Sequence, residues 1–192
     1  MELRPQDVVV VLKLLASGFN PWSYARLGEE LLMSPSHVHA SVARAETAHL
    51  LAAFNISSSA RRRGRGVLPE PNRNNLKEFL IHGVKYAFPV QRGGLTRGVP
   101  TAEGASPLKE HFPGNLPLPP VWPYAKGTVR GVAFEPLYNN VPEASLRDSA
   151  LYRLLVLVDA IREGRTRERE IAIRELTTGI DAAASQVQTN SL

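Results

Sequence analysis

Apolar residues recur at three- and four-residue intervals through the first fifty positions, which is the spacing of one face of a helix. The first stripe consists of Val8, Val11, Leu12 and Leu15. It predicts a helix over 5–16, and similar stripes predict helices over 23–32 and from Pro35 onward. Ser34 supplies a capping hydroxyl before the third helix, and proline suits the first helical position because an N–H there has no intrahelical partner.

The pattern changes after the third helix. Small and basic residues at 57–66 predict an exposed loop between two short strands. A fourth helix is expected over 76–86, opened by Asn75 and Glu78 at the spacing of a capping box. These elements together make up a first domain, 1–88.

Ten of the fifteen prolines lie in segment 89–142, and they exclude regular helix from most of it. The same segment holds many large apolar residues, which are too numerous for a solvated linker. We therefore expect an extended segment packed onto the domain, with one short strand near 128–134.

Leucine and valine return at helical spacing in the C-terminal region 143–179. Two helices are expected there, over 146–163 and 166–178, separated by Gly164. Their apolar residues are Leu151, Leu154, Leu155, Val158, Ile161, Ile171 and Leu176. This surface must be buried, either in a homodimer interface or against the rest of the same chain. The last residues, 180–192, are expected to form a disordered tail.

Composition narrows the class of protein. The chain has no cysteine, which excludes disulfides, thiolate zinc sites and iron–sulfur clusters. Its most apolar stretch, 8–16, is interrupted by Lys13 and is far shorter than the roughly 20 residues of a membrane helix. The N-terminus lacks the pattern of a secretory signal. These features favour a cytoplasmic protein that does not associate with membranes.

The formal net charge of +5 is unevenly distributed. The first hundred residues hold 13 basic and 7 acidic side chains, a formal +6, whereas the remainder holds 10 and 11, a formal −1. Clustered cations gain affinity for phosphates by releasing counterions. The charge therefore points to a polyanion partner for the N-terminal half.

Between Tyr24 and Glu46, four features follow one another: a leucine midway along a helix, a leucine that closes it, a Ser-Pro-Ser start and a docking valine. They are Leu27, Leu31, Ser34-Pro35-Ser36 and Val38. This segment resembles the helix-turn-helix of bacterial winged-helix transcription regulators. The stretch that follows, 45–51, resembles the passage from the recognition helix into the wing in that family. Three residues depart from the family pattern: Gly28 stands where alanine is usual, and Met33 and His49 stand where glycine is usual.

The resemblance covers about residues 5–85. It implies a mainly α fold with a small β wing (α+β), a winged helix-turn-helix followed by the Pro-rich segment and the two C-terminal helices. It also implies a DNA-binding transcriptional regulator, which we expect to be a repressor that binds double-stranded DNA as a homodimer.

The predicted recognition helix, 35–48, turns Val38, Val42 and Ala45 inward. Its outward face and its start carry the candidate DNA contacts Ser34, Ser36, His37, His39, Ser41 and Arg44. Arg44 or His37 is expected to contact bases, and Ser34 and Ser36, at the helix start, to contact phosphate. By the same resemblance, the wing would place further cations on the DNA backbone or minor groove, namely Arg61, Arg62, Arg63 and Arg65.

Other interpretations receive less support. His37 and His39 are two positions apart and cannot share a metal as an i, i+4 pair would, and His82 and His111 are isolated, so neither a metal nor a cofactor is expected. Known nucleotide-binding and hydrolase motifs are missing, so we expect no enzymatic activity. Gly93-Gly94, next to two arginines, is interpreted as a turn.

One rival class remains open. The chain could be a protein-interaction module that binds a partner protein through its Pro-rich and C-terminal segments. An autoregulating antitoxin and an adaptor are examples of this class. DNA binding and partner binding can also coexist in one chain.

Overall fold

The computed structural model describes residues 2–18, 22–53, 69–112, 116–163 and 166–189. These residues form a mainly helical fold with one two-stranded and one three-stranded sheet. None of the helices in these ranges combines the length and apolar character needed to cross a membrane.

The first three helices agree with the sequence expectation. They are α1 (Pro5–Ser17), α2 (Tyr24–Leu31) and α3 (Pro35–Thr47). Each begins at a side-chain cap. Asp7 accepts a hydrogen bond from the Arg4 N–H at 2.8 Å, and the hydroxyl oxygens of Ser23 and Ser34 accept from the N–H groups of residues three positions later. The caps satisfy donors that a helix start would otherwise leave without partners.

A tight turn joins α2 to α3. Leu32 adopts a left-handed conformation with φ of 57°, and the Met33 N–H donates to the Gly28 carbonyl oxygen at 2.8 Å. A Cβ atom on Gly28 would lie 2.6 Å from the Met33 carbonyl oxygen. The turn therefore requires glycine at position 28.

Two short strands follow α3. Strands β1 (Leu51–Ala53) and β2 (Pro69–Pro71) pair antiparallel, with Leu51 opposite Pro71 and Ala53 opposite Pro69. The chain between them, 54–68, lies outside the described residues. The prediction of two short strands around the basic segment is confirmed.

The fourth helix is longer than expected and begins earlier. It runs as α5 (Arg73–Glu78), a π-helical turn (Phe79–Gly83) and α6 (Val84–Ala87). Its cap is Asn72, whose side-chain oxygen accepts from the Asn75 N–H at 3.3 Å. The expected capping box at Asn75 and Glu78 is wrong, because Asn75 already lies inside the helix.

The Pro-rich segment holds three strands rather than one. Strands β3 (Arg92–Pro100), β4 (Pro120–Pro123) and β5 (Val129–Phe134) close into a small barrel, with β3 antiparallel to both neighbours and β4 parallel to β5. Short 3-10 turns at 102–104 and 108–111 connect β3 to β4. The expected strand near 128–134 is confirmed.

The expected turn at Gly93-Gly94 is wrong, because both glycines lie within β3. The pairing of β3 with β5 shifts register between Arg92 and Leu95, so the glycines fall at an irregularity of the sheet. Glycine inside a strand often marks such an irregularity.

Three helices complete the chain rather than the expected two: α7 (Val141–Arg147), α8 (Ser149–Glu163) and α9 (Thr166–Thr189). The expected start of a helix at 146 is wrong, because Leu146 belongs to the separate helix α7, which the sequence did not indicate. Helix α9 continues past Gly179, so the prediction of a disordered tail from residue 180 is wrong for the part of the tail that the structure describes. Ile180 is buried, and Asp181 pairs with Lys77 on α5 at 2.7 Å. These contacts hold the helix against α5.

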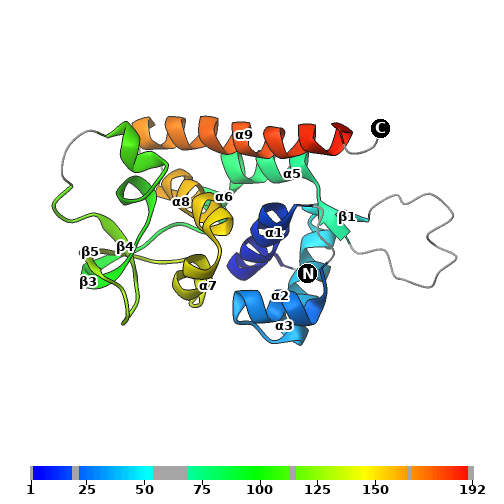
Figure 1. Cartoon of the computed structure of the whole chain (residues 1–192), viewed down its shortest axis with the longest axis horizontal. Coiled ribbons are helices and arrows are strands. Elements are labelled where there is room, and N and C mark those ends of the chain that lie inside the picture. Colours follow the sequence, from blue (N-terminus) through cyan, green and yellow to red (C-terminus); the bar gives the residue numbers. More distant parts are fainter. Residues whose placement is uncertain (1, 19–21, 54–68, 113–115, 164–165, 190–192) are drawn as a thin grey trace, which may run out of the picture.

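Helix α8 lies at the centre of the molecule, in contact with α1, α6 and α9 (Figure 1). Its apolar residues Leu151, Leu155, Val158 and Ile161 are at most 1% exposed within the single chain, and Leu176 of α9 is fully buried. These residues are therefore not available for the dimer interface that the sequence suggested. They pack instead against the N-terminal helices and the rest of the same chain, which was the other possibility left open.

A buried polar network attaches the barrel to α8. The Asp159 carboxylate accepts hydrogen bonds from Thr101 at 2.8 Å, from the Trp122 indole at 2.6 Å and from Arg162 at 2.7 Å. Burial raises the pKa of Asp159, an effect that the Arg162 charge and these hydrogen bonds oppose. Arg162 also donates to the backbone carbonyls of Phe88 and Glu135. The network thus ties the chain before β3 and the chain directly after β5 to one helix.

Candidate nucleic-acid interface

The first half of α3 presents polar side chains to solvent. Ser34, Ser36, His37 and His39 are all exposed, as the sequence predicted. The hydroxyl oxygens of Ser34 and Ser36 lie 3.0 Å apart, and the ring of His39 lies 5.1 Å from the ring of Tyr24 on α2. The structure therefore brings these four candidates together on one exposed surface at the start of α3.

Ser41 and Arg44 do not belong to that surface, and their assignment as DNA contacts is corrected. Ser41 is 1% exposed and Arg44 is 8% exposed. The Arg44 guanidinium donates to both carboxylate oxygens of Asp7, at 2.8 and 2.6 Å, and to the Ser41 hydroxyl at 3.2 Å. Helix α1 covers this flank of α3, so the buried face of α3 is wider than the Val38, Val42 and Ala45 stripe.

The pairing with Asp7 also determines the electrostatics of Arg44. The hydrogen bonds from the guanidinium to Asp7 raise the pKa of Arg44, although burial acts in the opposite direction. A fully buried carboxylate needs such a partner because an unpaired charge is costly to remove from water. Arg44 thus has a structural role in joining α3 to α1.

Without Arg44, the exposed surface of α3 contains no lysine or arginine. The nearest cation on the described part of the helix pair is Arg26 of α2, whose side chain is 66% exposed and donates to Glu30 at 2.8 Å. The candidate wing residues Arg61, Arg62, Arg63 and Arg65 lie outside the described residues. Positive charge for a phosphate backbone would come from that segment, which β1 and β2 flank.

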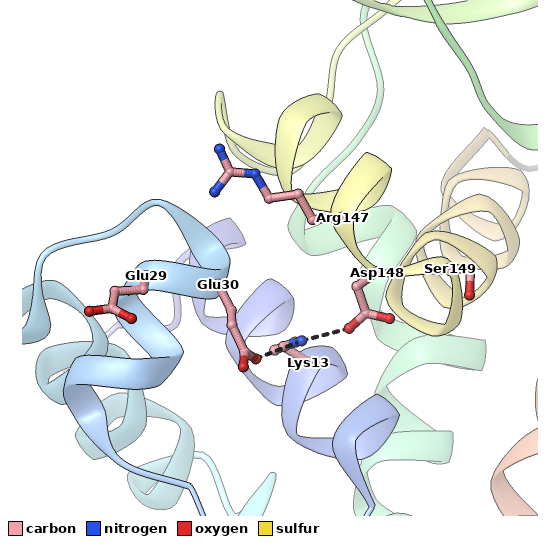
Figure 2. Close-up of a pocket in the computed structure, with 6 residues that line it drawn as sticks. All are labelled: Lys13, Glu29, Glu30, Arg147, Asp148 and Ser149. Carbon is pink, nitrogen blue, oxygen red and sulfur yellow. Dashed lines mark hydrogen bonds and ion pairs between the residues drawn. The ribbon is translucent and has the colours of Figure 1, made fainter.

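A second polar cluster, which sequence reasoning missed, joins the helix pair to the C-terminal helices (Figure 2). The Lys13 ammonium group lies 2.8 Å from a Glu30 oxygen on α2 and 2.6 Å from an Asp148 oxygen at the start of α8. The Lys13 side chain is 8% exposed, whereas those of Glu30 and Asp148 are 33% and 20% exposed. The one signal in the sequence was a lysine inside an otherwise apolar stretch.

Each member of this cluster is shifted toward its charged form. Burial would lower the pKa of Lys13, but the hydrogen bonds and charges of Asp148 and Glu30 outweigh burial and raise it. Burial would raise the pKa of Glu30 and of Asp148, but the contacts with Lys13 outweigh it and lower both. The cluster therefore consists of two ion pairs that share Lys13 and hold α1, α2 and the start of α8 together at neutral pH.

The cluster lies in an open cavity of about 500 Å³, lined also by Glu29, Arg147 and Ser149 (Figure 2). Arg147 pairs with Glu143 one turn earlier on α7 at 2.6 Å. Close to the cavity, the Asn140 amide donates to the Leu32 carbonyl oxygen at 2.5 Å, in the turn before α3. The C-terminal helices thus contact both α2 and the turn that positions α3.

A second cavity of about 500 Å³ lies behind the end of α3, between Leu50 and the π-helical turn. Its lining includes His49 and His82, and His49 adopts a left-handed conformation with φ of 57°. Glycine adopts such a positive φ at less cost than residues with a side chain. Within the described ranges, no three histidine or carboxylate side chains are grouped so that they could hold a metal ion.

Comparison of the chain with protein-family models, with curated proteins and with solved structures finds no match in any of the three.

Proposed function

We propose that the protein is a sequence-specific DNA-binding regulator that acts as a repressor and reads DNA with the first half of α3. The observation that carries the proposal is the arrangement of α2, its tight turn and α3, with Ser34, Ser36, His37 and His39 exposed together. In a helix-turn-helix, the start of the second helix enters the major groove and contacts base edges.

The side chains of this surface suit two kinds of DNA contact, one with phosphates and one with bases. Serine hydroxyls and free N–H groups at a helix start contact phosphates, and histidine side chains hydrogen-bond with base edges. The arginines of the segment between β1 and β2 supply the charge that α3 lacks, as wings do in the regulators that this segment resembles. Arg44 contributes indirectly, since its pairing with Asp7 fixes α3 on α1.

A dimer would place two α3 helices in half-sites about one helical turn apart. Leu151, Leu155, Val158 and Ile161 of α8 do not supply its interface, because they are buried within the chain. A dimer would therefore form through other surfaces of the chain.

The proposal is tested by fluorescence anisotropy with two labelled duplexes of equal length, one from immediately upstream of the protein's own gene and one of random sequence. We expect the upstream duplex to bind at least about a thousandfold more tightly. His37→Glu places a negative charge against the DNA and should abolish this preference. The matched control Thr178→Glu adds the same charge on α9, on the opposite side of the molecule from α3 (Figure 1). Equal affinity for the two duplexes would contradict the proposal.

A further inference from the structure

Two arginines lie side by side on neighbouring strands of the barrel. Arg97 of β3 and Arg130 of β5 are register partners, so their side chains leave the sheet on the same face, and both are exposed. Like charges in directly opposite positions of a sheet are unfavourable. An anionic partner bound to both side chains would compensate for this repulsion.

A third cation lies at the same end of the barrel. Lys126 is exposed in the turn between β4 and β5, and this turn packs closely on β3: the Tyr124 N–H donates to the Arg97 carbonyl oxygen at 3.1 Å. Gly127 approaches Gly98 so closely that any side chain there would overlap the β3 backbone. The backbone therefore holds Lys126 near the arginine pair.

Within the described part of the chain, no carboxylate forms an ion pair with Arg97, Arg130 or Lys126. The carboxylate that directly follows β5 belongs to Glu135. It is five residues beyond Arg130, a separation of roughly 16 Å along an extended strand. The other arginine of β3, Arg92, differs in this respect, because it lies 3.4 Å from Glu103. The three cations form an uncompensated positive patch.

Apolar side chains continue the same face. Leu95 is two positions from Arg97 on β3 and is 53% exposed, and its register partner on β5 is the half-buried Val132. Leu118, 44% exposed, precedes Pro119, whose carbonyl oxygen accepts from the Val132 N–H at 3.0 Å. Arginine is enriched in protein–protein contacts and exposed apolar side chains in a patch mark them, whereas a DNA backbone offers the leucines no partner.

We propose that this face of the barrel, formed by Arg97, Arg130, Lys126, Leu95 and Leu118, docks an acidic segment of a partner protein that carries apolar side chains between its carboxylates. The arginines bind the carboxylates, and the leucines receive the apolar side chains. In Figure 1 the barrel lies at the opposite end of the molecule from β1, so the two proposed interfaces are separate. This docking does not depend on DNA binding by α3.

The test uses a labelled synthetic peptide in which glutamates are interspersed with leucines, together with a version in which glutamine replaces every glutamate. The wild-type chain should bind the first peptide and bind the second at least about tenfold more weakly. Arg97→Gln/Arg130→Gln should weaken binding of the first peptide by about tenfold or more, and Leu95→Ser should weaken it severalfold. The matched control Arg153→Gln/Arg174→Gln removes two exposed arginines from α8 and α9 and should leave peptide binding unchanged.

A stability measurement separates a binding role from a structural one. Because the arginines repel each other, Arg97→Gln/Arg130→Gln should unfold at the same temperature as the wild type or at a higher one. A lower unfolding temperature would mean that the pair supports the fold, and this result would overturn the proposal.

Three binding results would also overturn it. The first is absence of peptide binding by the wild type, or binding that the arginine substitutions do not change. The second is a loss of affinity for random-sequence duplex DNA in the arginine variant, which would assign the patch to a nucleic acid. The third is a different oligomeric state of the arginine variant and the wild type, measured by light scattering, which would show that a second copy of the chain occupies the patch.

Discussion

Arg44 on α3 and Asp7 on α1 form a two-pronged, buried ion pair, with both carboxylate oxygens accepting hydrogen bonds from the guanidinium. Asp7 also caps the start of α1 through the Arg4 N–H. One carboxylate thus orders the first helix and fixes the third helix against it. The proposed DNA-reading surface depends on this pair for its position, although neither residue faces the DNA.

Removing one partner of a buried pair leaves the other charge uncompensated. We therefore expect Arg44→Ala to destabilise the fold by about 3–5 kcal/mol in urea-induced unfolding. The control Arg26→Ala removes an exposed arginine with an i, i+4 partner and should cost only about 0.3–0.5 kcal/mol. An Arg44→Ala variant of unchanged stability that had lost selectivity at a single base pair would instead restore the role that the sequence assigned to Arg44.

The Lys13 cluster predicts a pH dependence. Contacts with Lys13 lower the pKa of Glu30 and Asp148 in the folded state. A carboxylate with a lowered folded pKa contributes stability that is complete above its unfolded pKa of roughly 4 and is lost as the pH falls through the folded value. Stability measured by urea unfolding should therefore fall as the pH decreases from about 5 to 3.

Lys13→Met tests the origin of that dependence. At pH 7 it should destabilise the fold by about 1–3 kcal/mol, less than for a fully buried pair because Glu30 and Asp148 retain solvent contact. The difference from the wild type should shrink as the pH falls through the folded pKa values of Glu30 and Asp148, because protonated carboxyl groups no longer pair with the Lys13 charge. The control Lys77→Met breaks a pair with the exposed Asp181 and should show little of either effect. A difference that stays constant with pH would refute the bridging role.

Gly28 tests the geometry of the turn before α3. A methyl group there would lie 2.6 Å from the Met33 carbonyl oxygen, so Gly28→Ala should destabilise the fold by about 1–3 kcal/mol. Gly179→Ala is the matched control, because a methyl group at that position of α9 would meet nothing within 4 Å. It should stabilise the helix by about 0.5–1 kcal/mol. Equal effects of the two substitutions in thermal unfolding would show that the turn is looser than described.

The Arg-rich segment predicts a salt dependence of DNA binding. Each phosphate contact adds a counterion to those released, so replacing Arg61, Arg62, Arg63 and Arg65 with alanine should reduce the slope of log affinity against log salt by about one per arginine. Affinity for random-sequence DNA should fall along with affinity for the specific duplex, since backbone contacts do not read sequence. An unchanged slope in anisotropy titrations would remove the segment from the interface.

Local signals in the sequence were sufficient for the N-terminal helices. The apolar stripes, the serine before Pro35 and the strand pair around the basic segment all depend on residues close together in the chain, and the structure confirms them. The burial of Arg44 could not be read in the same way, because it depends on where α1 crosses α3. Its only signal was Asp7, an acidic residue directly before a run of valines.

The barrel was missed for a related reason. Its strands pair over long separations: Val99 of β3 lies opposite Trp122 of β4, and Leu95 lies opposite Val132 of β5. Neither partner can be found from periodicity, and the prolines at both ends of β4 suppress its strand signal. The burial of the C-terminal leucines likewise depended on long-range packing. Their apolar stripe indicates that the helix face is buried, but it does not say whether a second copy or the same chain covers it.

The central claim is that the exposed start of α3 lies against DNA, and the absence of native cysteine allows a direct measurement. His37→Cys creates a single thiol that can carry a photoactivatable cross-linker, and Thr178→Cys places the same group on α9 as a control. Irradiation with the duplex from upstream of the gene should yield a covalent protein–DNA product for position 37, mapped to defined bases, and none for position 178. Cross-linking from position 178 but not from position 37, or from neither position while the DNA is bound, would contradict the account.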